Sequence, residues 1–192
     1  MNLFSFSAAK HYCRSFAASP GASINGTDHF LSSYAKKTKV VTEGTTEYAQ
    51  LRDALLRDTD RRLFLSLGSY RRAILNTNSG SAYWSCVSLY YTSFFCAQAI
   101  LGMFGGWING FGKLWIENVG NTPGNLSLQV NFSKHPSTLT GGGGHRIFWD
   151  AYYNSIPQLT AFIDPKYSNA LQPINSQELI SKLKMCQHHL YL

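Results

Sequence analysis

The stretch SAYWSCVSLYYTSFFCAQAILGMF, residues 81–104, decides the fold of this chain. It lies in a run from Ala73 to Gly112 that has no charged side chain, although the chain contains 17 Lys+Arg and 10 Asp+Glu. Such a stretch is apolar enough for a buried central helix or for a membrane span. Tyr90 and Tyr91 would fall near the middle of a span, where polar hydroxyls are unfavourable, so the pattern favours a buried helix. A membrane-associated protein with a span over residues 84–104 is the alternative.

The sequence outside this stretch predicts further helices and one hairpin. Leucines at helical spacing, behind Thr45 or Thr46 as N-cap, predict a helix that runs to about Leu75. Alternating residues predict two strands around a Gly- and Pro-containing turn. The fold class is therefore mainly α, with a helical domain over residues 45–192 that follows an N-terminal arm or short helix at 1–44. The remaining expected elements are strands at 113–119 and 126–132, which form an inserted β-hairpin or irregular loop around 105–145, and helices at 3–17, 147–156 and 176–191.

The composition of the chain indicates which classes of partner to expect. A formal net charge of +7 favours an anionic partner such as RNA or another nucleic acid. Only 14% of residues are charged, while there are 12 Phe, 11 Tyr and 4 Trp, which favours a protein partner or a homo-oligomer. The four cysteines form no CxxC pair and there is no signal-peptide pattern, so we expect a reduced, cytoplasmic protein without membrane attachment. No metal site and no cofactor are expected.

Three arginines form a candidate nucleic-acid-binding face. On a helix over residues 45–75, Arg57, Arg61 and Arg72 fall within about 60° of one another, at ~100° per residue. The opposite side carries the leucine stripe, which is expected to anchor the helix and consists of Leu51, Leu55, Leu63, Leu67, Tyr70 and Ile74. The arginine fork suits phosphate because it donates to two oxygens at once. The alternative is a solvated face that interleaved acids neutralise, namely Asp53, Asp58 and Asp60.

A glycine run precedes the candidate catalytic pair His145 and Arg146. A histidine can move a proton, and an arginine can stabilise charge on phosphate, so this pair would suit metal-independent RNA cleavage. The run lacks the Lys-Ser/Thr ending of a P-loop. The alternative is a loop before an ordinary helix that packs Ile147, Phe148 and Tyr152.

Two segments resemble the HEPN superfamily. Residues 90–101, YYTSFFCAQAIL, are similar to a "YYAAFFAAHALL" helix of that superfamily, within a likeness of about 25 residues, and residues 145–149, HRIFW, are similar to an "HRxxW" segment of some members. The resemblance implies a HEPN-like helical bundle, frequently dimeric, of the kind common in bacterial toxin–antitoxin and anti-phage systems. Many members are metal-independent endoribonucleases.

The chain departs from the catalytic signature of that superfamily, an Arg followed by four to six residues and a His. None of its eight arginines, at positions 14, 52, 57, 61, 62, 71, 72 and 146, has a His at that distance. Two hypotheses follow. One is a non-catalytic subunit that binds RNA or a protein partner, and the other is an endoribonuclease effector that uses His145 and Arg146.

Overall fold

The computed structural model describes Ala8 and residues 27–32, 37–109, 112–122, 124–136 and 144–160. The chain divides into two compact units, residues 1–155 and residues 156–192, and almost all of the described residues belong to the first. The predicted helix at 176–191 and most of that at 3–17 lie outside the described residues. The assignment of residues 1–44 and 45–192 to an arm and a domain stays a prediction.

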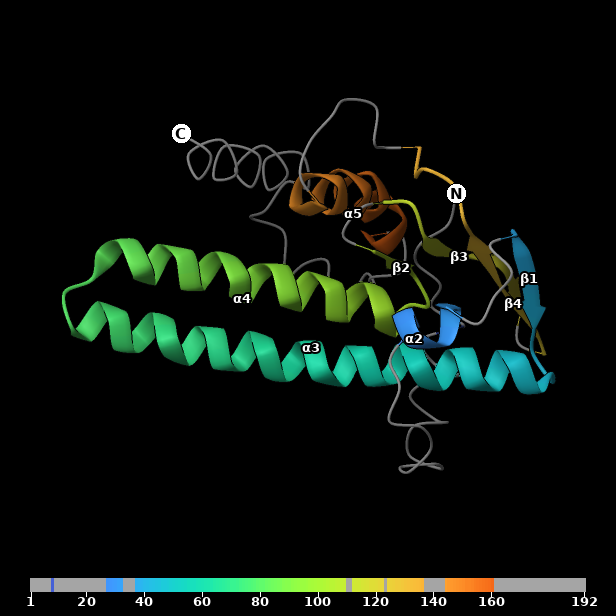
Figure 1. Ribbon diagram of the computed structural model, residues 1–192, viewed down its shortest axis with the longest axis horizontal. Coiled ribbons are helices and arrows are strands. Elements are labelled where there is room, and N and C mark those ends of the chain that lie inside the picture. The colour runs from blue at the N-terminus through green and yellow to red at the C-terminus, as the bar shows by residue number, and fades with distance from the viewer. Residues whose placement is uncertain are drawn as a thin grey trace. The chain divides into compact units, whose positions relative to one another are not determined.

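A long helical hairpin forms the main part of the first unit (Figure 1). Helix α3 spans Thr46–Asn78, and Thr45 caps it by accepting a hydrogen bond from the Tyr48 amide at 3.2 Å. Helix α4 spans Ala82–Met103 and lies along α3. The connecting turn places Gly80 at φ +77°, a conformation that glycine adopts without strain. The predicted helices at 45–75 and 81–104 are therefore confirmed.

A four-stranded antiparallel sheet packs against the first half of α3. Its order is β1 (Lys39–Thr42), β4 (Asn125–Asn131), β3 (Trp115–Thr122) and β2 (Trp107–Ile108). The β3–β4 hairpin confirms the predicted hairpin. Strands β1 and β2 were not predicted, because two to four residues are too few for a period-two pattern. Apolar side chains of the sheet and of α3 form one core, which includes Val41, Tyr48, Leu51, Leu55, Trp107, Ile116, Leu126, Leu128 and Val130.

Two further helices flank the hairpin. In α2 (Thr27–Ser32), the Thr27 amide donates to Asp58 Oδ2 of α3 at 3.0 Å. Helix α5 (Gly144–Thr160) begins three residues before the predicted start at 147. Its Phe148 ring packs edge-on against Phe94 of α4, with centroids 5.0 Å apart. The described elements are thus mainly helical, as predicted.

The leucine stripe of α3 departs from prediction in its second half. Leu51 and Leu55 are buried, but Leu67 is 65% exposed and Ile74 is 46% exposed. The first half of α4 is likewise uncovered, since Trp84 is 59% exposed. The prediction that the stripe anchors the whole of α3 is therefore wrong. The physical reason is that the sheet and α5 reach only the other end of the hairpin.

His135 is a buried histidine beside the sheet. Its side chain is 1% exposed, and its ring lies edge-on to Trp115 with centroids 4.8 Å apart. Burial lowers the pKa of His135 from 6.5 to about 4. The folded state therefore binds a proton less readily than the unfolded chain, in which the pKa is ordinary.

We expect His135 to make folding stability pH-dependent below neutrality. Above pH ~6.5 His135 leaves the free energy of unfolding unchanged. As the pH falls from there toward ~4, its effect lowers the free energy of unfolding. The loss at pH ~4.5 is about 2 kcal/mol, after allowance for solvent screening. Urea unfolding at about pH 7 and 4.5, for the wild type and His135→Gln, measures it. An equal pH dependence in both proteins would contradict the assignment.

Candidate functional site

The fold brings together the two segments that carry the family resemblance. The His145 ring of α5 stacks on Phe94 of α4, with centroids 4.3 Å apart and planes inclined by 13°. It also lies edge-on to Tyr91 and stacks at longer range on Tyr90. Residues 55 positions apart in the chain thus share one aromatic cluster, which continues through Phe148, Trp149, Tyr152 and Tyr153.

The Tyr90 hydroxyl links this cluster by hydrogen bonds. The Trp149 indole N–H, which can only donate, donates to the Tyr90 oxygen at 3.2 Å. The same hydroxyl lies 2.8 Å from His145 Nδ1. The Tyr90 hydroxyl can donate to Nδ1 or accept from it, depending on the tautomer of the imidazole. In either tautomer Nδ1 is engaged by Tyr90.

Burial favours the neutral form of His145. Burial among the aromatic rings lowers the pKa of His145 below its usual 6.5. Arg146 points elsewhere, because its side chain is 53% exposed and its Nε lies 4.0 Å from Asp150 Oδ2, a loose pair on one helix face. Burial, with a smaller effect from Cys96, raises the pKa of Tyr152 to about 12. Tyr152 therefore stays protonated at neutral pH.

This arrangement suits packing better than proton abstraction. A general base needs an unprotonated nitrogen turned toward the substrate. In His145, Nδ1 faces the Tyr90 hydroxyl and the ring is stacked on Phe94. The sequence pairs His145 with Arg146, but the structure pairs it with Tyr90 and Phe94. The resemblance was the only sequence signal for that contact.

The three arginines of the candidate nucleic-acid-binding face lie on one unbroken helix. Gly68 does not interrupt α3, so Arg57, Arg61 and Arg72 keep their angular relation. Arg61 and Arg72 are exposed, and Arg57 is half-buried. Within the part of the chain that the structure describes, these three guanidinium groups make no ion pair.

Two of the acids expected to neutralise this face have other partners. Asp53 accepts hydrogen bonds from Arg52 at 2.8 and 3.0 Å. Asp58 accepts from the Thr27 amide. Neither carboxylate forms an ion pair with Arg57, Arg61 or Arg72 among the described residues.

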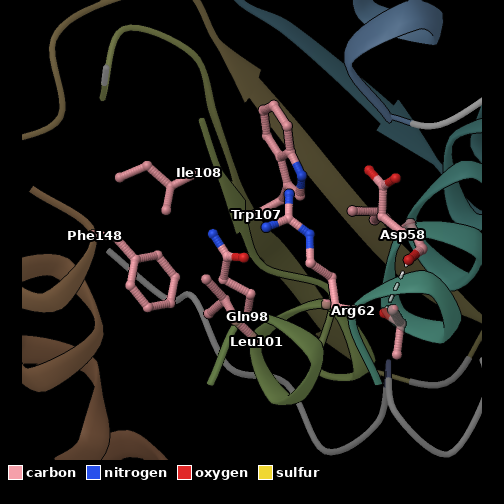
Figure 2. A pocket seen from close by; sticks show the side chains of 10 residues that line it. Asp58, Arg62, Gln98, Leu101, Trp107, Ile108 and Phe148 are labelled. Carbon is pink, nitrogen blue, oxygen red and sulfur yellow. Dashed lines mark hydrogen bonds between the residues drawn. The ribbon is translucent and has the colours of Figure 1, made fainter. Parts of the chain in front are cut away.

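A small pocket contains polar residues that sequence reasoning missed. Asp58 and Arg62 of α3 and Gln98 of α4 line it together with apolar neighbours such as Trp107 and Phe148. Figure 2 shows the Arg62 side chain extending toward Trp107 and Gln98. The pocket is partly open, and its volume of about 10 Å³ accommodates about one water molecule and is too small for a substrate. No local sequence pattern marks this pocket, because its walls come from distant segments.

The described residues contain no metal-ligating cluster. Among the described residues, no three His, Cys, Asp or Glu side chains gather into a group able to hold a metal ion. Helix α4 is long and apolar enough to cross a membrane by length and composition, with 28% of its most apolar window buried. In comparisons with protein-family models, curated proteins and solved structures, nothing matched this chain significantly.

Proposed function

We propose that this protein is a non-catalytic, RNA-binding subunit of HEPN-like type that acts in the bacterial cytoplasm, in an anti-phage or toxin–antitoxin system. RNA binds along the face of α3 formed by Arg57, Arg61 and Arg72. The defence role rests on the resemblance of residues 90–101 and 145–149. The contact between these segments, through Tyr90 and His145, supports that resemblance because it gives both motifs one packing role.

The observation on which RNA binding rests is that Arg57, Arg61 and Arg72 make no ion pair with any residue that the structure describes. Arg57 and Arg61 are separated by about 6 Å along the helix axis, and Arg61 and Arg72 by about 16 Å, at 1.5 Å per residue. A row of this length can contact several successive phosphates of one strand. An arginine without a carboxylate partner loses no ion pair when it binds phosphate, so its full electrostatic contribution is available.

The state of His145 supports a subunit that does not cleave the RNA it binds. Metal-independent cleavage needs a proton acceptor near the 2′-hydroxyl and a cation at the phosphate. His145 is engaged by Tyr90 and stacked on Phe94, while Arg146 faces solvent beside Asp150. The two groups therefore do not converge on one point.

Replacing all three arginines by alanine is expected to weaken RNA binding and flatten its salt dependence. Each lost phosphate contact lowers the slope of log K against log salt by about 0.7 for a single strand, so the triple variant loses about 2 units of slope. Fluorescence anisotropy with a labelled RNA of about 20 nucleotides, between about 50 and 300 mM KCl, measures both quantities.

A charge-matched control separates this face from general basicity. Lys37, Lys113 and Lys134 are exposed and lie away from α3, so their triple alanine variant removes the same charge elsewhere. Its slope is expected to stay close to that of the wild type. Equal losses in the two triple variants would contradict the assignment of the RNA-binding face. RNA cleavage by the wild type that His145→Ala abolishes would contradict the non-catalytic role and favour the endoribonuclease alternative.

A further inference from the structure

The outer half of the α3–α4 hairpin buries small side chains and exposes large ones. Between the helices, Ser85 Oγ donates to the Ala73 carbonyl at 2.9 Å, and Ser66 Oγ donates to the Thr92 carbonyl at 3.0 Å. Ser66, Ala73 and Ser85 are buried there. The large apolar side chains of the same helices point outward, where they gain nothing from the hairpin itself.

Four of these side chains form a continuous line on α3. Leu63, Leu67, Tyr70 and Ile74 are 40%, 65%, 51% and 46% exposed. Their spacing of four, three and four residues is that of the contact positions in paired helices, so they share one face. We call these four residues the apolar seam. Arg61 and Arg72 lie on the opposite side of α3.

The seam offers an apolar area suited to a weak interface. At about half of the 150–250 Å² that a large side chain can bury, its four residues offer on the order of 400 Å², which is below the value of about 800 Å² per partner in a stable complex. Of the 13 exposed large hydrophobics among the described residues, 11 lie on this hairpin, on more than one side of it. Besides the seam they are Phe64, Leu65, Leu75, Tyr83, Trp84, Leu89 and Tyr91.

The charge beside the seam favours an acidic partner. The chain has no Asp or Glu between Asp60 and Glu117. Of the nearby arginines, Arg61 and Arg72 lie on the opposite side of α3, and Arg62 lines the pocket beside Gln98. Arg71 follows the seam residue Tyr70 directly and lies beside the seam. A partner that supplies carboxylates at its flanking positions would complement this surface.

Other occupants fit less well. A second copy docked through the seam would bring a second Arg71 to it and no carboxylate, and residues 176–191 of this chain contain two lysines and one glutamate. A membrane-spanning hairpin would hold two arginine pairs about 15 Å apart, half of the ~30 Å hydrocarbon thickness. The hairpin turn, residues 76–81, is also polar.

We propose that the apolar seam docks an amphipathic α-helix of a protein partner, with Asp or Glu flanking the apolar stripe of that helix. This activity is separate from RNA binding, because the seam and the arginines of the RNA-binding face lie on opposite sides of α3. The protein therefore presents two independent surfaces on one helix.

The test uses the full chain and designed helical peptides as probes. One peptide has leucine at the two contact positions of each heptad and glutamate at the flanking positions, and its matched peptide has lysine in place of glutamate. The seam variant is Leu63→Ser with Leu67→Ser. The control variant is Leu65→Ser with Leu75→Ser, two exposed leucines of α3 outside the seam.

The glutamate peptide is expected to bind the wild type at about 1–100 μM, and the seam variant at least tenfold more weakly. The affinity of the control variant for the glutamate peptide and the affinity of the seam variant for RNA are expected to change less than about threefold. This test and that of the RNA-binding face therefore fail separately. Undetectable binding of the glutamate peptide, equal binding of the lysine peptide, or equal loss in both variants would overturn the proposal. Light scattering that shows a dimer which the seam variant abolishes would instead assign the seam to a second copy. Seam-dependent binding to anionic lipid vesicles, without peptide binding, would assign it to a membrane.

Discussion

Phe148→Ala is expected to lower the free energy of unfolding by about 3–5 kcal/mol. The Phe148 side chain is 2% exposed, and its ring contacts Phe94, Trp149 and Tyr152 at centroid distances of 5.0, 5.4 and 5.8 Å. Alanine removes these contacts and leaves a cavity between α5 and α4. Because total stabilities are about 5–15 kcal/mol, the change would loosen α5 from the hairpin. Urea unfolding followed by tryptophan fluorescence measures the loss.

Phe64→Ala is the matched control. Phe64 is 68% exposed on α3, so the same chemical change is expected to alter stability by no more than about 0.5 kcal/mol. The difference between the two variants tests the packing of α5 rather than a general cost of removing phenylalanine. Similar losses in both would contradict the arrangement of α4 and α5 described above.

Local signals in the sequence were sufficient to locate the long helices and the β3–β4 hairpin. Thr45 as N-cap, the turn with Gly80, and the alternation on both sides of residues 120–125 each act within a few residues. Strand β1 has no such signal, because its pairing with β4 joins Val41 to Leu128 across the sequence. Only the tertiary fold determines that contact.

Periodicity located the apolar stripe of α3 but not its burial. Leu55 and Leu67 belong to the same face by spacing, yet Leu55 is fully buried and Leu67 is 65% exposed. A helical pattern states which residues share a face, and it carries no information on whether another element reaches that face. The exposed seam is therefore a feature that only the structure reveals.

The candidate site shows the same limit. Adjacency in the sequence suggested that His145 and Arg146 act together, but on a helix adjacent residues point about 100° apart. His145 turns toward Tyr90 and Arg146 toward solvent. The state of a histidine depends on the hydrogen bonds of both ring nitrogens, which come from other elements, so no local motif could fix it.

The two helical glycines of the hairpin predict opposite effects of one substitution. Gly102 of α4 faces Thr59 of α3, and a Cβ at Gly102 would overlap the Thr59 hydroxyl. That hydroxyl donates to the Leu55 carbonyl at 2.9 Å, so moving it aside breaks a buried hydrogen bond. Gly68 lies in the interior of α3 with open space around its Cβ position.

Gly68→Ala is expected to stabilise the protein by up to about 1 kcal/mol, because alanine restricts the unfolded chain and favours helix. Gly102→Ala is expected to destabilise it by about 1–2 kcal/mol, because overpacking at the helix contact outweighs the same gain in propensity. Chemical denaturation of these two variants, of Thr59→Ala and of the double variant Thr59→Ala/Gly102→Ala measures these effects. Removing the Thr59 hydroxyl makes room for the new methyl, so the double variant is expected to be more stable than additivity of the two single changes predicts. Stabilisation by both glycine substitutions would contradict the close approach of α3 and α4 at Thr59 and Gly102.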